Sequence, residues 1–326
     1  MISPKVSVLV AAYNVENTIK IAIESILNQS YQNVEIIVVN DCSTDKTNSI
    51  LDRYASQITI ITNENNSGLS YSRNVALDRA TGNFIMFMDG DDYFLDTDVI
   101  EQMLHVATTN VSDLVVADFN YVNQNANTIS QRKTNNSIEH MYSGAWNKLY
   151  SSYLWESRRF PENILYEDAG IILDIALSAK KITSLNKPIY AYRQNGNTIT
   201  QSLNNPERHL DILKSITFGL NKTNLMSAPF EMKQAGLRYI NHILLGHLIV
   251  VKMEYEESES KEKVANKLIN YMQNHDLKQA GFSKKYLHNL YQKAIFYLLE
   301  NKIFNPILNT FLKTAIIIRN KRRNNK

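Results

Sequence analysis

The sequence predicts an α/β fold in which helices flank a mostly parallel sheet, followed by a helical C-terminal region. Over the first hundred residues, short apolar and β-branched runs alternate with segments whose apolar residues recur at helical spacing. This alternation is typical of βαβ units, whose strands run parallel and are buried on both faces. After about residue 200, strand patterns become rare and long helical periodicities take their place. We therefore expect two domains, 1–203 and 204–326, with a boundary near 201–206.

The first elements follow directly from their patterns. Residues 6–12 (VSVLVAA) form a short apolar run, as expected of a doubly buried strand. Residues 17–29 predict a helix because their apolar side chains fall on one helical face. Residues 34–39 (VEIIVV) repeat the strand pattern and end at Asn40-Asp41. A first βαβ unit is therefore expected over residues 6–39.

The same alternation continues along the chain. Residues 44–54 predict a helix because Ser43, Thr44 or Asp45 can cap it. A strand at 58–62, a helix at 68–80 and a strand at 84–88 (FIMFM) follow. Beyond them, helices are expected at 169–179, 211–221, 230–253 and 261–274.

Composition narrows the classes of protein. The single Cys42 excludes a disulfide framework and a cysteine zinc site, which favours a reducing compartment. No apolar run reaches the roughly 18 residues that a membrane span needs. The net charge is +3, but five of the last eight residues are Lys or Arg, and 30 basic residues face 32 acidic ones elsewhere. We expect a cytoplasmic protein without a nucleic-acid surface.

Small and polar residues follow each predicted strand, at 12–14, 40–43, 63–68 and 89–92. Because ligands of parallel sheets bind beyond the carboxyl ends of the strands, these residues are expected to form one site. The sequence Asp89-Gly90-Asp91-Asp92 alone is compatible with a surface turn. Alternatively, the acids share a divalent cation with a diphosphate, since one or two Asp plus phosphate oxygens suit Mg²⁺ or Mn²⁺.

Read in order, these motifs resemble the family 2 glycosyltransferases, which have the GT-A fold. They are VSVLVAAYN, VVNDCSTD, NSGLSYSRN and FMDGDD, followed by WNKLY, Glu167-Asp168 and YAYRQNGNT. The later motifs match the smaller bacterial members, and the likeness covers about residues 5–200. It implies that residues 1–203 form a GT-A catalytic domain that binds a nucleotide sugar. It further implies an inverting, metal-dependent transfer from a UDP-sugar to a hydroxyl of a glycan, polymer or lipid-linked acceptor. The Gln-x-x-Arg-Trp motif of processive members is absent, which favours the transfer of one sugar.

The resemblance also implies roles for donor-site residues. Asp91 would bind Mn²⁺ or Mg²⁺ directly, and Asp89 would lie near the metal or the ribose. Asp41 would accept a hydrogen bond from uracil, although it could instead cap a helix. Arg73 would clamp phosphate oxygens, with a surface ion pair as its alternative. The remaining expected donor-site residues are Ala12, Tyr13, Asn66, Gly68 and Gly90.

Asp168 is implied to be the general base, which takes the proton of the acceptor hydroxyl. Acids at a helix start are also favoured by the helix dipole, so a purely structural role stays open. Trp146 and Lys148 would border the sugar and acceptor, with a core position for Trp146 equally open. Three further residues are expected near the acceptor or in a loop over the phosphates: Glu167, Tyr192 and Arg193.

The same residues argue against two other enzyme classes. A phosphatase would carry its Asp-x-Asp pair after the first strand, and a nucleotidyltransferase would have a glycine-rich loop there. A non-catalytic nucleotide-sugar-binding subunit remains the alternative, against which the presence of Asp89, Asp91 and Asp168 argues. The abundance of Asn, Ile and Lys indicates an AT-rich bacterial genome. Surface glycan biosynthesis is therefore the expected context.

The C-terminal residues form an amphipathic stripe over 303–316, and the basic cluster 319–326 follows it. Such a helix can lie on anionic lipid, which would place the protein at the inner face of the plasma membrane. It can equally pack on the helical domain or on a second subunit of a homo-oligomer. Both interpretations stay open.

Overall fold

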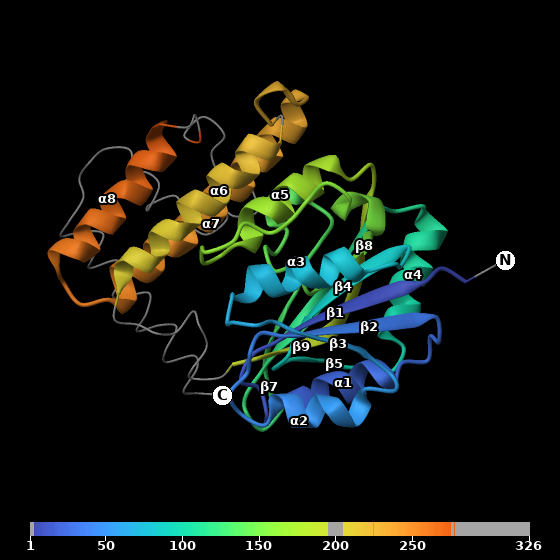
Figure 1. The fold of residues 1–326 in the computed structure, drawn as a ribbon. Coiled ribbons are helices and arrows are strands. Elements are labelled where there is room, and N and C mark those ends of the chain that lie inside the picture. The colour runs from blue at the N-terminus through green and yellow to red at the C-terminus, as the bar shows by residue number, and fades with distance from the viewer. Residues whose placement is uncertain (1–2, 195–204, 224, 275–276, 278–326) are drawn as a thin grey trace.

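The protein is built around one large sheet (Figure 1). The computed structural model describes residues 3–194, 205–223 and 225–274, together with Leu277. Within them, nine strands form a sheet of order β3-β2-β1-β4-β8-β6-β9-β5, and β7 pairs with β6 outside this path. The strands are β1 (Val6–Ala12), β2 (Val34–Asn40), β3 (Thr59–Thr62), β4 (Phe84–Asp89), β5 (Tyr93–Phe94), β6 (Leu114–Val122), β7 (Thr128–Arg132), β8 (Lys148–Ser151) and β9 (Ile182–Arg193).

The first four strands are parallel, as the sequence predicts. Val6 pairs with Val34 on β2 and with Phe84 on β4, and β3 continues the parallel block beside β2. The interior residues of β1, Val8 and Leu9, are almost completely buried. Doubly buried parallel strands explain why these segments read as continuous apolar runs.

The second half of the sheet is mixed. β8 is antiparallel to both β4 and β6, whereas β6 and β9 are parallel. The register of β6 against β9 shifts around Asp118, opposite Pro188, which has no N–H to donate to the ladder. These strands extend the predicted sheet beyond residue 89.

Helices cover both faces of the sheet. In Figure 1, α1 and α2 lie on one side and α3 and α5 on the other. The helices are α1 (Ile19–Leu27), α2 (Thr47–Leu51), α3 (Leu69–Arg79), α4 (Val99–Asn110), α5 (Asp168–Ser178), α6 (Asp211–Lys222), α7 (Phe230–Glu254) and α8 (Glu259–Asn274). The helix predicted over 44–54 is shorter, because it changes to a 3₁₀ turn at Asp52–Tyr54. Further 3₁₀ turns lie at Ile138–His140, Ser152–Trp155, Pro206–Leu210 and Leu225–Ser227.

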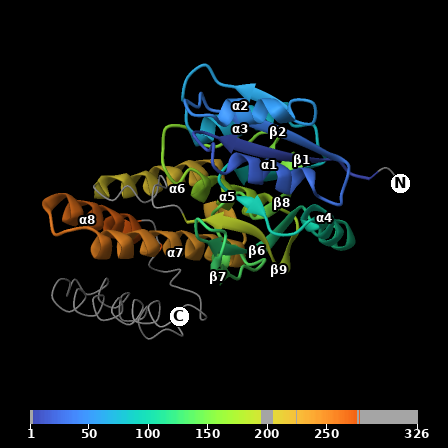
Figure 2. The same cartoon turned by 90° about the horizontal axis from the view of Figure 1, so that it is seen from below.

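The C-terminal helices pack on the rest of the fold through α5 and through the 3₁₀ turn at Ile138–His140 (Figures 1 and 2). The three helices predicted after residue 205 are confirmed as α6, α7 and α8. The boundary predicted near 201–206 falls largely in 195–204, outside the described residues, as do the stripe at 303–316 and the basic cluster. Those expectations therefore stay predictions. Among the described residues, no helix combines the length and apolarity required to cross a membrane.

Candidate active site

The register of the parallel strands gathers the predicted polar residues at one edge. Ala11 of β1 pairs with Val39 on one side and Asp89 on the other. Beyond the strand ends, the Asp41 N–H donates to the Ala12 carbonyl at 2.8 Å, and the Gly90 N–H donates to the Ala11 carbonyl at 2.9 Å. Ala12, Asp41, Asp89 and Gly90 therefore line one rim, as the sequence predicts.

Asp41 is buried and fixes the loop after β3. Its Oδ1 accepts from Asn63 Nδ2 at 2.7 Å and from the Ser67 N–H at 2.9 Å, and its Oδ2 accepts from the Gly68 N–H at 2.7 Å. A carboxylate offers about four lone-pair positions, so a further donor can still be accepted. The structure thus gives Asp41 a structural role that leaves room for the predicted contact with a base.

The other predicted donor-site residues near this rim differ in exposure and in backbone conformation. Tyr13, just after β1, is 45% exposed, and Asn66 is exposed in the loop that Asp41 holds. Gly68 precedes α3 with φ of 88°, a conformation that favours glycine. A Cβ on Gly90 would lie 3.0 Å from the Ala11 carbonyl oxygen, so the backbone passes closely there.

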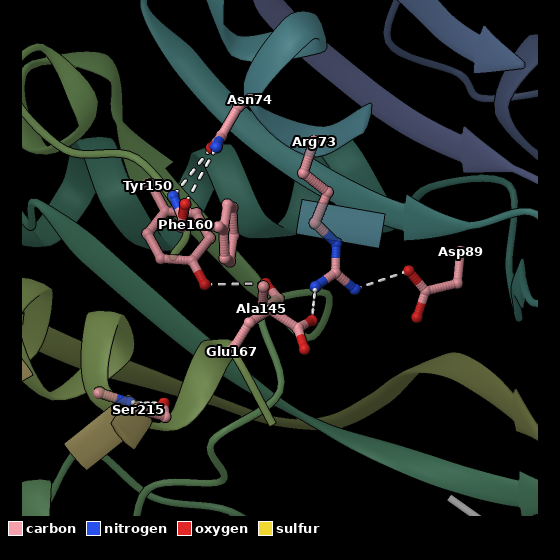
Figure 3. Close-up of polar contacts among 9 residues, drawn as sticks. Arg73, Asn74, Asp89, Ala145, Tyr150, Phe160, Glu167 and Ser215 are labelled. Atoms are coloured by element: carbon pink, nitrogen blue, oxygen red, sulfur yellow. Dashed lines mark hydrogen bonds and ion pairs between the residues drawn. The ribbon is translucent and has the colours of Figure 1, made fainter. Parts of the chain in front are cut away.

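Arg73 joins the rim to the start of α5 (Figure 3). One terminal nitrogen lies 2.7 Å from Asp89 Oδ1, and the other lies 2.6 Å from Glu167 Oε1. Its guanidinium also stands over the Phe160 ring, at 5.3 Å from the centroid. Arg73 therefore forms a buried bridge between two carboxylates, and its expected contact with phosphate oxygens stays a prediction. The alternative, a surface ion pair, is wrong, because Arg73 is only 3% exposed.

The turn after β4 is supported from β9. Asp92 is buried, and it accepts from the Tyr190 hydroxyl at 2.9 Å and from the Arg193 N–H at 2.7 Å. Burial, followed by the charges of Asp91 and Asp89, raises the pKa of Asp92 well above its usual value. The Tyr190 hydroxyl also accepts from the Asp89 N–H. Asp92 thus shapes the turn that presents Asp89 and Asp91. The only sequence signal for the contact between Asp92 and Tyr190 is that Tyr190 belongs to the YAYRQNGNT motif.

Arg193 lies against the same turn. Its Nε donates to the Asp91 carbonyl at 2.8 Å, and one terminal nitrogen donates to the Gln124 carbonyl at 3.1 Å. The other terminal nitrogen is buried and has no hydrogen-bond partner among the residues that the structure describes. A buried guanidinium N–H without a partner is costly, so this position suits an anionic oxygen.

Asp89 and Asp91 can hold a divalent cation only if a bound ligand supplies the remaining atoms of its coordination shell. Asp89 and Asp91 are two oxygen donors in the turn after β4, separated by Gly90, and Asp89 Oδ1 is already paired with Arg73. Within the part of the chain that the structure describes, no cluster of three or more His, Cys, Asp or Glu could hold a metal ion. Because Mg²⁺ is commonly bound by one or two carboxylates plus phosphate oxygens, this donor set fits a site that a diphosphate completes.

Asp168 is the first residue of α5 and follows a strained turn. Tyr166, two residues earlier, has φ of 59°, in the left-handed region. Burial and the charge of Glu167 raise the pKa of Asp168 to about 8, while Arg73 and Lys148 act in the opposite direction. A carboxyl group with a pKa near the working pH is suited to general-base catalysis.

Two residues expected at the acceptor are instead in the core. Lys148 is fully buried, and its ammonium donates to the Tyr142 and Gly144 carbonyls and to Asn147 Oδ1. All three of its donors are used, so it does not present a hydrogen-bond donor to an acceptor sugar. Trp146 is 3% exposed and stacks between Tyr190 and Tyr192, which corresponds to the core alternative.

The chain is similar to known proteins over the region just described. The family model "Glycosyl transferase family 2" matches residues 7–173. "Glycosyltransferase GlyA" of Streptococcus pneumoniae is 27% identical over 296 residues, covering 82% of this chain. The Escherichia coli enzyme WfaP, named as a UDP-Glc:alpha-D-GlcNAc-diphosphoundecaprenol beta-1,3-glucosyltransferase, is 41% identical over 107 residues, or 32% of this chain. The chain spans 42% of the length of GlyA and 43% of that of WfaP.

A solved structure shares the fold. The crystal structure of S. aureus TarS residues 1–349 in complex with UDP superimposes with a TM-score of 0.70. The match covers 95% of this chain and 91% of that chain, with 22% sequence identity. This likeness establishes a common architecture for the sheet and its helices.

Proposed function

The chain belongs to glycosyl transferase family 2, and from this premise we propose that it transfers one sugar from a UDP-sugar to an acceptor hydroxyl, with inversion of the anomeric carbon. The observation that carries the proposal is the Arg73 bridge between Asp89, on the acidic turn, and Glu167, which precedes Asp168. The acidic turn and the start of α5, which would hold the diphosphate and the base respectively, are thereby fixed relative to each other.

The donor side suits a uridine diphosphate. Tyr13 offers an exposed ring for stacking, and Asp41 can accept one further hydrogen bond from a pyrimidine N–H. The fold shared with TarS, which was crystallised with UDP, supports this choice of nucleotide. The unpartnered nitrogen of Arg193 would donate to a phosphate oxygen beside Asp91.

Asp91 and Asp89 would hold Mn²⁺ or Mg²⁺ together with the diphosphate. The ion would supply positive charge to the leaving diphosphate. The protein holds Asp89 in place through Arg73 and through the Tyr190 contact to its backbone. The repulsion between neighbouring acids is thereby offset before any ligand arrives.

Asp168 would accept the proton of the acceptor hydroxyl as that oxygen attacks the anomeric carbon. The C–O bond to the new sugar forms while the bond to the diphosphate breaks, and the proton stays on the carboxylate. General-base assistance of this kind typically contributes about 10²- to 10⁴-fold.

One relative supports a proposal for the acceptor class. The name of WfaP includes a diphosphoundecaprenol-linked sugar acceptor. The proposed acceptors for this chain are lipid-linked glycans, soluble glycans and polymers. The proposed context is bacterial surface glycan biosynthesis. The transfer would take place in the cytoplasm, and a lipid-linked acceptor would be used at the inner face of the membrane.

The test is UDP release from a panel of UDP-sugars with Mn²⁺, with the product anomer assigned by NMR. Turnover is expected to require the metal and to be lost in Asp91→Asn and Asp168→Asn, with UDP binding retained in Asp168→Asn. Asp78→Asn is the matched control, since Asp78 is exposed and pairs with Arg159 at the surface. Tight UDP-sugar binding without turnover by the native chain would favour the non-catalytic binding subunit instead.

A further inference from the structure

The C-terminal helices hold the short segment that carries Asp168. Residues 165–170 are contacted by several side chains from beyond residue 205. They come from the 3₁₀ turn at Pro206–Leu210, from α6 and from α7. No pattern in the sequence links these distant helices to the start of α5.

Ser215 of α6 caps the first turn of α5. The Gly170 N–H, one of the first-turn donors that lack a partner within the helix, donates to Ser215 Oγ at 3.0 Å (Figure 3). Glu167, the residue before the helix, gives no side-chain cap. Ser215 is completely buried, so water does not substitute for its hydroxyl.

Tyr239 of α7 contacts the same turn of α5 by donating a hydrogen bond to a backbone carbonyl group in that turn. Its hydroxyl donates to the Ala169 carbonyl at 3.0 Å, and the side chain is 2% exposed. Ala169 directly follows Asp168. The N–H of Gly170 and the carbonyl of Ala169 are thus fixed by two different helices.

Tyr166, which has a positive φ and precedes Glu167 and Asp168, also contacts the C-terminal helices. The Tyr166 ring packs against His209 and His247, with centroids at 5.8 Å and 4.4 Å. The two histidines are joined through their Nδ1 atoms at 2.8 Å. The Leu165 N–H donates to Asp211 Oδ2 at 3.2 Å.

The backbones of α5 and α6 touch, which makes this support rigid. A Cβ on Gly170 would lie 1.8 Å from the Ser215 carbonyl oxygen, and one on Gly219 would lie 2.3 Å from the Gly170 carbonyl oxygen. The start of α5 therefore has little freedom to move relative to α6.

We propose that Ser215 and Tyr239 are positioning residues that aim the Asp168 carboxylate, so that the C-terminal helices form part of the catalytic machinery. The proposal rests on the assignment of Asp168 as general base. It differs from a general packing role because it concerns the orientation of one carboxylate rather than the stability of the fold.

The test compares Ser215→Ala and Tyr239→Phe with Thr217→Val and Tyr271→Phe. The control pair removes a hydroxyl contact of the same kind between α6 and α8, at a partly exposed position. In the test variants, kcat is expected to fall about 10- to 100-fold, as for a small displacement of a reacting group, while the donor KM changes less than about twofold. The controls should keep both constants.

The second readout is the titration of Asp168 itself, followed by ¹³C NMR of aspartate-labelled protein and assigned by the signal lost in Asp168→Asn. A loosened turn admits water, so the midpoint is expected to move to lower pH in the test variants only. The charged and titratable groups that act on Asp168 are Glu167, Arg73, Lys148, Asp89, Tyr142, Tyr150 and Tyr239. Of these groups, only Tyr239 is changed in a test variant.

The two readouts separate the two proposals. If the native chain turns over no UDP-sugar, the proposed function fails, and the NMR midpoints still decide whether Ser215 and Tyr239 set the environment of Asp168. Unchanged kcat and unchanged midpoints in both test variants, or equal changes in the controls, would overturn the positioning role.

Discussion

Arg73 and Glu167 lie 94 positions apart in the sequence, and their side chains meet at 2.6 Å in the interior of the protein. The same guanidinium contacts Asp89 at 2.7 Å. Because one cation serves both carboxylates, the acidic turn after β4 and the start of α5 are fixed relative to each other. The separation between the acidic turn and the start of α5, which carries Asp168, is thereby set within the protein.

Removing this cation is expected to destabilise the fold strongly. In Arg73→Ala, two largely buried carboxylates lose their counter-charge, which typically costs about 3–5 kcal/mol. The free energy of unfolding, measured with urea, should fall by that amount.

Arg159→Ala provides the control for Arg73→Ala. Its ion pair with Asp78 is well exposed, at 39% and 60%, so its loss should cost at most about 1 kcal/mol. Equal losses in the two variants would contradict a special role for the buried bridge.

Turnover is expected to depend on the protonation of Asp168. Its raised pKa of about 8 means that the carboxylate form, which alone accepts a proton, is depleted as the pH falls below that value. The rate should therefore rise with pH up to about 8 and then level off.

Glu167→Gln tests the cause of this pH dependence. Because the negative charge of Glu167 raises the pKa of Asp168, its removal should move the midpoint of the pH–rate profile to lower pH. The exposed Glu156→Gln is the control and should leave the midpoint in place. A shift to higher pH in Glu167→Gln would show that the coupling has the opposite sign.

The first half of the fold was predictable because its signals are local. Each doubly buried strand, such as Val6–Ala12, is a continuous apolar run, and parallel pairing then brings the strand ends together. The strands β5 and β8, with two and four residues, are too short to show a period. The whole rim of Ala12, Asp41 and Asp89 followed from this reasoning.

The partners of individual site residues were not predictable. Arg73 and Lys148 are charged residues that usually lie at the surface, and only the tertiary fold shows that both are buried. The motif that contains Lys148 gives no sign that three oxygens inside the core accept hydrogen bonds from its side-chain nitrogen. Ser215 and Tyr239 lie in helices whose periodicity reports only which face is apolar.

The crossing of α5 and α6 predicts opposite effects for two glycines. In Gly170→Ala, the new methyl group would lie 1.8 Å from the Ser215 carbonyl oxygen, so the helices must separate, at a cost of about 1–3 kcal/mol or more. Gly246 lies inside α7, and no atom of the described residues lies within 4 Å of a Cβ placed there, so Gly246→Ala should stabilise by roughly 0.5–1 kcal/mol. Thermal unfolding of both variants checks the prediction, and a stabilised Gly170→Ala would show that the two helices do not touch as described.

Acid is expected to weaken the contact between Tyr166 and the C-terminal helices. Burial lowers the pKa of His209 to about 4 and that of His247 to about 3, from 6.5. Both are neutral in the folded state where the unfolded chain already binds protons, so their stabilising contribution is complete above pH 6.5 and is lost as the pH falls toward those values. His247→Asn keeps a polar group but removes one titrating site, which should reduce the slope of unfolding free energy against pH by up to about 1.4 kcal/mol per pH unit between about pH 5 and 6. Urea unfolding at several pH values measures this slope, with the exposed His105→Gln as control. An unchanged slope in His247→Asn would mean that His247 is already protonated in the folded protein.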